Sequence, residues 1–182
     1  MDQMDLVDLL EEKRFLGQEF LTWLWFKSDE RGGTIFVPDI GDVQVVFEKH
    51  MLLEYGKGDA HEKLICQGLQ TELKEARTGL AMGKKLEQAR ILLAKDNYEW
   101  NLTLKADLFE FRSVKLPKTM AASEEGDDPA AVEGRLLDRI GLLEEAAGVI
   151  DELFRLFLKS RVSPDWDEEV AKMQAWIKKT AF

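Results

Sequence analysis

The feature that most constrains this chain is an almost unbroken apolar run at residues 20–26, Phe-Leu-Thr-Trp-Leu-Trp-Phe, which contains two of its five tryptophans. The run belongs to a segment with apolar residues at helical spacing, which we expect to form a helix from about residue 6 or 13 to residue 28. A helix that is apolar on nearly every side is buried rather than amphipathic. Leaving its rings in water would forfeit several kcal/mol of burial, at roughly 25 cal/mol per Å². The segment therefore predicts the centre of a small hydrophobic core.

The same rings could instead form a platform on which unpaired nucleic-acid bases stack, at ~1–3 kcal/mol per base. Such platforms combine the aromatic rings with a positively charged groove. Residues 20–26 contain no charge, and only Lys27 follows them. We favour the core interpretation for this reason.

After this helix, apolar and polar residues alternate with a period of two, which predicts an antiparallel sheet. Its clearest signal is a hairpin, in which residues 86–95 and 98–105 flank a turn at Asp96-Asn97. Apolar and polar residues alternate in the second of these strands, which is typical of a sheet with one buried and one wet face. Further β-rich runs occupy residues 34–37, 43–54, 61–67 and 108–114, and a helical pattern over residues 71–82 interrupts them. We expect an antiparallel sheet of about five or six strands with one inserted helix.

Small, acidic, Gly and Pro residues at 118–130, KTMAASEEGDDPA, are typical of an exposed linker. This acidic linker divides the chain into a helix-plus-sheet domain over residues 1–117 and a C-terminal helical pair over residues 131–182, which we expect to pack on the first part. The pair consists of a long helix and a final helix that begins after Ser163-Pro164. Ser163 or Asp165 would cap the final helix, and we interpret the acidic residues that follow as favouring its positive end rather than as a metal site. The predicted fold class is α+β, with a buried N-terminal helix and a C-terminal helix pair.

The chain carries a net charge of −10, which by itself argues against binding to nucleic acid. The charges are unevenly distributed, because residues 57–118 contain 12 basic and 9 acidic side chains whereas both flanking thirds are acidic. Five cations within 17 residues of this central third are candidates for phosphate contacts: Lys74, Arg77, Lys84, Lys85 and Arg90. Glu72, Glu75 and Glu87 are interspersed among them, so a mixed, solvated surface is an alternative of equal weight.

Little in the residue pattern points to catalysis or to a bound cofactor, and an enzyme with a cluster of polar residues around His61 or Cys66 is the third interpretation. His50, His61 and Cys66 are too few and too scattered for a zinc site, and Cys66 lies in an apolar strand pattern that favours a buried thiol. Residues 79–85 have three residues between their glycines and lack the Ser or Thr of a phosphate-binding loop. We expect a protein without catalytic residues, cofactors or a metal site.

The single cysteine rules out an internal disulfide framework and suits a reducing compartment. No stretch approaches the ~18 apolar residues that span a bilayer. The first ten residues are acidic and lack the basic region of a signal peptide. These features predict a cytoplasmic protein that does not bind a membrane.

The long helix expected from about residue 132 to 160 carries apolar residues at strict heptad spacing. Steps of 4, 3, 4, 3, 4 and 3 connect Leu136, Ile140, Leu143, Ala147, Ile150, Phe154 and Phe157. This spacing, kept over three heptads, indicates close contact with another helix. The contact is either with the chain's own helices or, for part of the stripe, with a second copy in a homodimer.

Three stretches resemble the recombination-associated protein RdgC family, particularly its compact members: FLGQEFLTWLWFKSDERGG at 15–33, EARTGLAMGKKLEQARILL at 75–93 and GRLLDRIGLLEEAAGVIDELFRLFL at 134–158. The resemblance is one of pattern and order across most of residues 13–179. It implies a DNA-binding protein without catalytic residues, which closes as a ring-shaped dimer around duplex DNA and restrains recombinase action.

We therefore expect a non-enzymatic protein that binds double-stranded DNA without sequence specificity, acts in recombination as a homodimer and is associated with the nucleoid. The alternative is a protein–protein interaction module with a helical dimer interface and no nucleic-acid role. The acidic net charge and the heptad stripe support this alternative.

Overall fold

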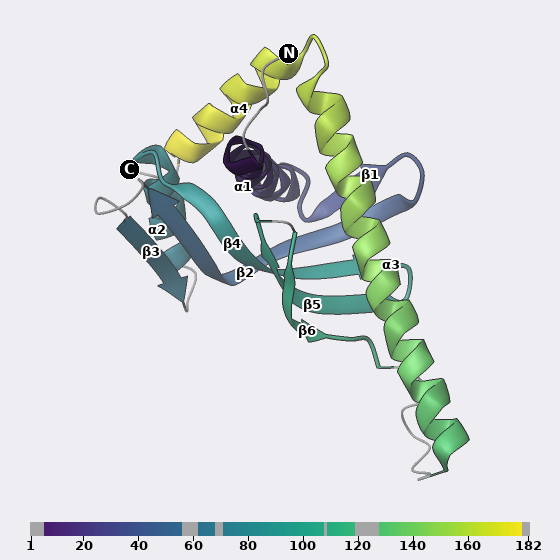
Figure 1. Cartoon of the computed structure of the whole chain (residues 1–182). Coiled ribbons are helices and arrows are strands. Elements are labelled where there is room, and N and C mark those ends of the chain that lie inside the picture. The colour runs from purple at the N-terminus through teal and green to yellow at the C-terminus, as the bar shows by residue number, and fades with distance from the viewer. Residues whose placement is uncertain (1–5, 56–61, 68–70, 108, 119–127, 180–182) are drawn as a thin grey trace.

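The computed structural model describes residues 6–55, 62–67, 71–107, 109–118 and 128–179, and it confirms the α+β class. The described residues form two layers, a six-stranded antiparallel sheet and four helices that pack on one of its faces (Figure 1). In chain order the elements are α1 (Leu6–Glu30), β1 (Thr34–Val37), β2 (Gly41–Tyr55), β3 (Glu62–Gln67), α2 (Thr71–Ala81), β4 (Lys85–Lys95), β5 (Tyr98–Lys105), β6 (Phe111–Lys115), α3 (Pro129–Arg161) and α4 (Trp166–Lys179). The inserted helix and the C-terminal helix pair both occur where the sequence predicted them.

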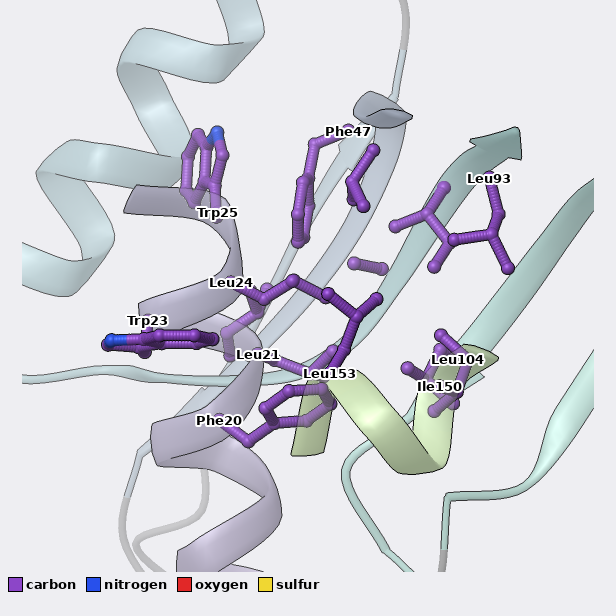
Figure 2. Close-up of a cluster of buried hydrophobic side chains, with 14 of the residues drawn as sticks. Phe20, Leu21, Trp23, Leu24, Trp25, Phe47, Leu93, Leu104, Ile150 and Leu153 are labelled. Atoms are coloured by element: carbon purple, nitrogen blue, oxygen red, sulfur yellow. The ribbon is translucent and has the colours of Figure 1, made fainter. Parts of the chain in front are cut away.

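Helix α1 is buried along the apolar run that predicted it. Six of its side chains are less than 5% exposed: Phe20, Leu21, Trp23, Leu24, Trp25 and Phe26. The ring of Trp25 stacks on Phe47 of β2 at 5.9 Å, and the ring of Phe20 meets Phe157 of α3 at 5.6 Å. Figure 2 shows Phe20, Leu21 and Leu24 of α1 beside Leu153 of α3, and Trp25 beside Phe47 of the sheet. The core interpretation of the tryptophan-rich run is confirmed.

The sheet has the strand order β1-β2-β4-β5-β6, and every pair of strands is antiparallel. The long strand β2 pairs along one edge with β1 and then β3, while its other edge pairs with β4. The predicted hairpin joins β4 to β5, and Asp96 adopts a positive φ of 53° in its tight turn. Strand β6 lies at the outer edge of the sheet, and its free edge has no strand partner in the described part of the chain.

The two faces of the sheet have different surroundings because side chains alternate along each strand. Val45, Leu93 and Trp100 lie in register across β2, β4 and β5 and are fully buried under the helices. Their neighbours Val46 and Leu92 point to the opposite face, where Val46 is 40% exposed. No described helix covers this second face, which we call the open face of the sheet.

Helix α3 packs on the sheet through its C-terminal half alone. Its buried residues are Leu142, Ala146, Val149, Ile150, Leu153 and Phe157. The indole Nε1 of Trp100 donates a 2.9 Å hydrogen bond to the carbonyl of Leu142, at the point where α3 meets the sheet. None of residues 129–141 is buried, and Figure 1 shows this half of α3 running past the sheet beside β6. We call residues 129–141 the overhang.

The predicted linker at 118–130 lies largely outside the described residues, since positions 119–127 are not among them. Helix α3 already begins at Pro129, three residues before the start that the pattern predicted. A proline at the first turn is tolerated there because its missing N–H would have no partner within the helix.

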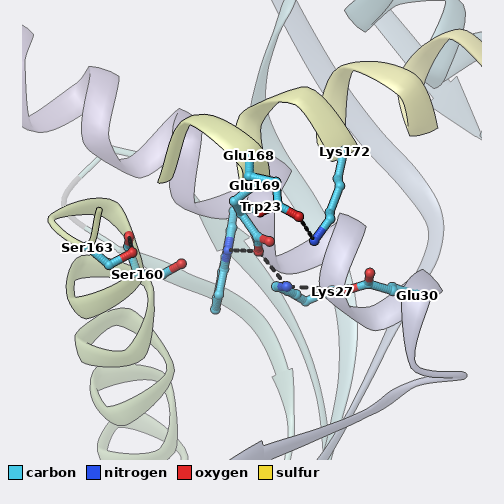
Figure 3. A network of polar contacts seen from close by, with 8 residues as sticks. All are labelled: Trp23, Lys27, Glu30, Ser160, Ser163, Glu168, Glu169 and Lys172. Atoms are coloured by element: carbon cyan, nitrogen blue, oxygen red, sulfur yellow. Dashed lines mark hydrogen bonds and ion pairs between the residues drawn. The ribbon is translucent and has the colours of Figure 1, made fainter. Parts of the chain in front are cut away.

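Helix α4 lies across α1 and is held there by a polar network (Figure 3). The carboxylate of Glu169 accepts a 3.2 Å hydrogen bond from Trp23 Nε1 and pairs with the ammonium of Lys27. The hydroxyl of Ser163 donates to the carbonyl of Ser160 at 2.8 Å, which closes the turn between α3 and α4. Glu169 therefore anchors α4 to α1 in addition to standing at the positive end of its helix.

Candidate interaction surfaces

Arg77, one of the predicted DNA contacts, is enclosed by α1 and α4 rather than presented to solvent. Its guanidinium pairs with the carboxylate of Asp29 and lies over the rings of Trp25 and Trp176, at 5.4 and 4.4 Å. The indole Nε1 of Trp176 also donates to Asp29, at 3.1 Å. Burial lowers the pKa of the Arg77 guanidinium below its ordinary value. These contacts join α1, α2 and α4, so the cation is engaged within the fold.

Lys84 and Arg90 also have acidic partners. Lys84 Nζ lies 2.6 Å from the carboxylate of Glu62, and its hydrogen bond holds the pKa of Glu62 below the ordinary range. Arg90 Nε lies 3.0 Å from Glu48 and donates a 2.7 Å hydrogen bond to Asn101. Each of these ion pairs offsets one of the positive charges on which the predicted patch depends.

The remaining two cations, Lys74 and Lys85, are exposed, and neither forms an ion pair with another described side chain. Lys85 lines a groove of 160 Å³ together with residues of α1 and α4. Arg90 points instead to the open face of the sheet, because it lies in register with Thr103 on the face opposite the core. The five predicted cations do not form one water-facing surface.

A different set of cations shares the open face of the sheet. Arg90, Thr103 and Arg112 are paired across β4, β5 and β6, and paired residues of a sheet point to the same side. Lys105 and Lys115 occupy positions of the same face, opposite Gln88 and Asn101. The period-two alternation of β5 places Lys105 on the wet face of the sheet, so its position was readable from the sequence.

These open-face cations are largely balanced by acids. Glu110 lies 3.3 Å from Lys105 and 2.8 Å from Arg112, and the hydrogen bond from Arg112 holds the pKa of Glu110 below its ordinary range. Of the cations on this face, Lys115 alone makes no ion pair with a described side chain. The open face is thus weakly positive at most.

The residues considered for chemistry are not brought together. Cys66 is buried at 3% exposure in β3, as its apolar pattern predicted, whereas His50, one pair away on β2, occupies a position of the opposite face. His61 lies outside the described residues. Among the residues that the structure describes, no group of His, Cys, Asp and Glu has the arrangement of a metal site.

The heptad stripe of α3 is divided between the core and the solvent. Ile150 and Phe157 are buried at 2% and 0% exposure, and Phe154 packs against the core beside Phe20. Leu136, Ile140 and Leu143 are exposed, and Ala147 is half-buried between the two groups. The first part of the predicted stripe can therefore contact another molecule, whereas Ile150 and Phe157 belong to the chain's own core.

Two large apolar residues extend the exposed part of the stripe. Val132 is 49% exposed and Leu137 is 61% exposed, and both lie on the overhang. Neither residue belongs to the single row that the heptad spacing connects. Their exposure widens the apolar surface at this end of α3.

A groove between β6 and α3 adjoins the overhang. It has a volume of 540 Å³ and is lined by Phe111, Val114, Leu116, Arg139, Leu143, Glu144 and Ala147. Two of these, Leu143 and Ala147, belong to the heptad stripe. The exposed row of the overhang therefore leads to the groove at Leu143.

Comparison with protein-family models, curated proteins and solved structures gave no match to this chain. The resemblance to the RdgC family thus remains a prediction from the sequence pattern. Within the described residues, no helix combines the length and the apolar character needed to cross a membrane.

Proposed function

We propose that this chain is a protein-interaction module rather than an enzyme, and that the overhang of α3 is its docking surface. The observation that carries the proposal is a group of five large apolar side chains that are 38–61% exposed, four on the overhang and Leu143 just beyond it: Val132, Leu136, Leu137, Ile140 and Leu143. Single exposed apolar side chains are normal on a soluble protein, whereas a contiguous apolar patch of a few hundred Å² is often functional. The fold does not need this surface, because α3 docks through its other half.

The exposed surface is large enough to support a specific complex. The five exposed fractions add up to about two and a half fully exposed side chains, whose burial contributes about 4–7 kcal/mol. A partner helix with a similar surface doubles this gain, and association itself costs at least about 4 kcal/mol. The difference is at most about 4–10 kcal/mol, a range that includes the ~8 kcal/mol of a complex of micromolar affinity.

Photocrosslinking in the native cell tests this function. A benzophenone amino acid is placed at Leu137 on the overhang and, as a matched control, at Lys172 on the solvent side of α4, which is also exposed. We expect discrete protein adducts from position 137 and none from position 172. Absence of any adduct at 137 above the level at 172 would refute the proposed function.

A second candidate function is sequence-nonspecific binding of duplex DNA, in recombination as the resemblance implies. The observation in its favour is that Arg90, Lys105, Arg112 and Lys115 share the open face of the sheet, which no described helix covers. Phosphate contacts of this kind weaken steeply as salt rises. The acidic partners Glu48 and Glu110 and the net charge of −10 weigh against it.

Gel shifts on random duplex DNA at low and high salt separate the two cation sets. If the open face binds DNA, Arg90→Glu with Lys115→Glu abolishes the shift, while Lys84→Glu with Lys85→Glu leaves it. The reverse pattern would support the patch predicted from the sequence. Wild-type protein that gives no shift at low salt excludes both.

A further inference from the structure

We propose that the partner of the overhang is a second copy of the same chain, and that the two α3 helices associate in parallel and in register over residues 132–147. The inference rests on the proposed function of the overhang as a docking surface. It identifies the partner and the orientation of the complex, which the exposure of the surface alone does not.

The residue types at the heptad positions favour a parallel pair of helices. If Ile140 occupies position a of the heptad, Leu136 and Leu143 both occupy position d. An isoleucine at a between leucines at d is the arrangement that favours two-stranded parallel coiled coils. Because all three side chains are exposed, they are available for such packing without any change in the fold.

The charges that flank the stripe at positions g and e agree with the parallel orientation, whereas Glu133, at the preceding position a, faces its own copy at the exposed start of the contact. In the same heptad, Arg139 occupies position g and Glu144 occupies the next position e, five residues later. In a parallel pair, g of one helix lies beside the following e of the other, so Arg139 lies beside the partner's Glu144, and the symmetry repeats the ion pair. In an antiparallel pair, g faces g and e faces e, which would set arginine beside arginine and glutamate beside glutamate.

The same spacing accounts for the two exposed residues outside the heptad row. Val132 also occupies g and Leu137 the following e, so a parallel pair brings Val132 against the partner's Leu137. Leu137 is the most exposed large apolar side chain of the overhang, at 61%. A single g-to-e rule thus explains one apolar pair and one charged pair on neighbouring heptads.

The contact between the two α3 helices ends at the groove beside β6. Its lining joins Leu143 and Ala147 of the stripe to Phe111, Val114 and Leu116, which add apolar surface for the partner helix. Beyond Ala147 the stripe enters the chain's own core at Ile150, and no further pairing is available. About two heptads alone make a weak coiled coil, so the groove is the part of the interface that adds to its stability.

Sedimentation equilibrium on the full chain tests the partner and the orientation. We expect a reversible dimer, and we expect Arg139→Glu and Glu144→Arg each to raise its dissociation constant by about 10-fold, because each reverses two symmetric ion pairs. The double variant restores the pairs and is expected to recover the wild-type constant. Lys159→Glu, on the same helix but outside the interface, is the matched control and is expected to have no effect.

Cysteine crosslinking tests the register directly. Leu136 and Ile140 lie about 6 Å apart along the helix axis. Only a parallel pair in register therefore lets both Leu136→Cys and Ile140→Cys form a disulfide with the identical position of the partner. The wild-type chain is the control, since its Cys66 is buried, and Gly148→Cys, on an exposed side of α3 away from the stripe, is expected to stay reduced.

The possible outcomes separate this inference from the proposed function. A protein that stays monomeric at about 100 μM refutes the second copy as partner, yet photoadducts of position 137 with another protein would leave the docking function standing. A dimer that ignores both charge reversals, or that crosslinks at position 140 but not at 136, refutes the parallel register. A dimer that follows the charges and crosslinks at both positions establishes it.

Discussion

The packing of α1 on the sheet depends on the absence of a side chain at Gly17, and Gly17→Ala tests this directly. Gly17 is buried in α1 where the helix passes the chain segment that follows β5. A Cβ at this position would lie 2.7 Å from the carbonyl carbon of Ala106 and closer still to its oxygen. The obstacle is backbone, which has no rotamer that moves it away. Alanine at position 17 therefore requires α1 to move away from the sheet.

The expected loss of stability follows from three contributions. The backbone of Ala106 is held in place because its N–H donates a 2.8 Å hydrogen bond to the carbonyl of Glu87 in β4. Overpacking of a core of this kind costs about 1–3 kcal/mol, and moving α1 also loosens the aromatic contacts of Phe20 and Trp25, which contribute about 0.5–1.5 kcal/mol each. Alanine favours the helix over glycine by about 0.5–1 kcal/mol. We expect a net loss of about 2–4 kcal/mol, or a fall in Tm of roughly 5–15 °C for a chain of this size.

The matched control is Gly148→Ala in α3. Gly148 is helical and exposed, and a Cβ there meets no atom within 4 Å. The same substitution is therefore expected to raise the free energy of unfolding by about 0.5–1 kcal/mol. Urea denaturation followed by far-UV circular dichroism and by tryptophan fluorescence measures both variants. A Gly17→Ala protein as stable as the wild type would show that α1 does not pack on Ala106 as described.

Three further expectations concern individual contacts. Arg77→Met removes the ion pair with Asp29 and the contacts with two tryptophan rings, and should lower the free energy of unfolding by about 2–3 kcal/mol in urea titrations. The control Lys172→Met, on the exposed side of α4, should change this free energy by less than about 0.5 kcal/mol. Trp100→Phe removes the hydrogen bond to the carbonyl of Leu142, and chemical denaturation should show a loss of about 1–2 kcal/mol; no loss would mean that this bond does not fix α3 on the sheet. Lys84→Met should raise the pKa of Glu62 towards 4.5 in an NMR titration, because Lys84 lowers this pKa in the wild type. The ion pair stabilises the fold fully above the pKa that Glu62 has in the unfolded chain. Its contribution is lost as the pH falls through the lower pKa of Glu62 in the folded protein.

The elements and the core of this fold were predictable because they depend on local periodicity. The run at residues 20–26 is apolar on every side, and the strands of the β4–β5 hairpin alternate around a turn that accommodates a positive φ at Asp96. Each of these two signals is contained in a short stretch of consecutive residues. Their consequences, a buried helix and a sheet with one wet face, required no knowledge of distant contacts.

The charged surface was not predictable in the same way, because ion pairs join residues that are far apart in the sequence. Arg77 pairs with Asp29, 48 positions earlier, and Lys84 pairs with Glu62, 22 positions earlier. Counting cations in the central third could not reveal that acids from α1 and β3 would neutralise them. The strand register determines the face of the sheet on which a cation lies. Arg90 therefore lies on the open face, whereas Lys85, five residues earlier, lines the groove beside α1 and α4.

Helix α3 shows why a heptad pattern alone did not distinguish a core helix from an interface. Its buried row, Leu142, Ala146, Val149 and Leu153, also steps by 4, 3 and 4, but it lies about a third of a turn from the row that begins at Leu136. Ile150 and Phe157 lie between the two rows, which is why they are buried although they belong to the heptad stripe.

Because the buried row and the exposed row of α3 are distinct, substitutions in them should affect different processes, folding and self-association. Leu153→Ala is expected to lower the free energy of unfolding by about 2–5 kcal/mol, because it leaves a cavity in the core. Ile140→Ala on the exposed row should leave the unfolding of the monomer nearly unchanged at low protein concentration and weaken only the self-association. If Ile140→Ala instead destabilised the monomer as much as Leu153→Ala, the overhang would be part of the fold and the reason to regard it as a docking surface would disappear.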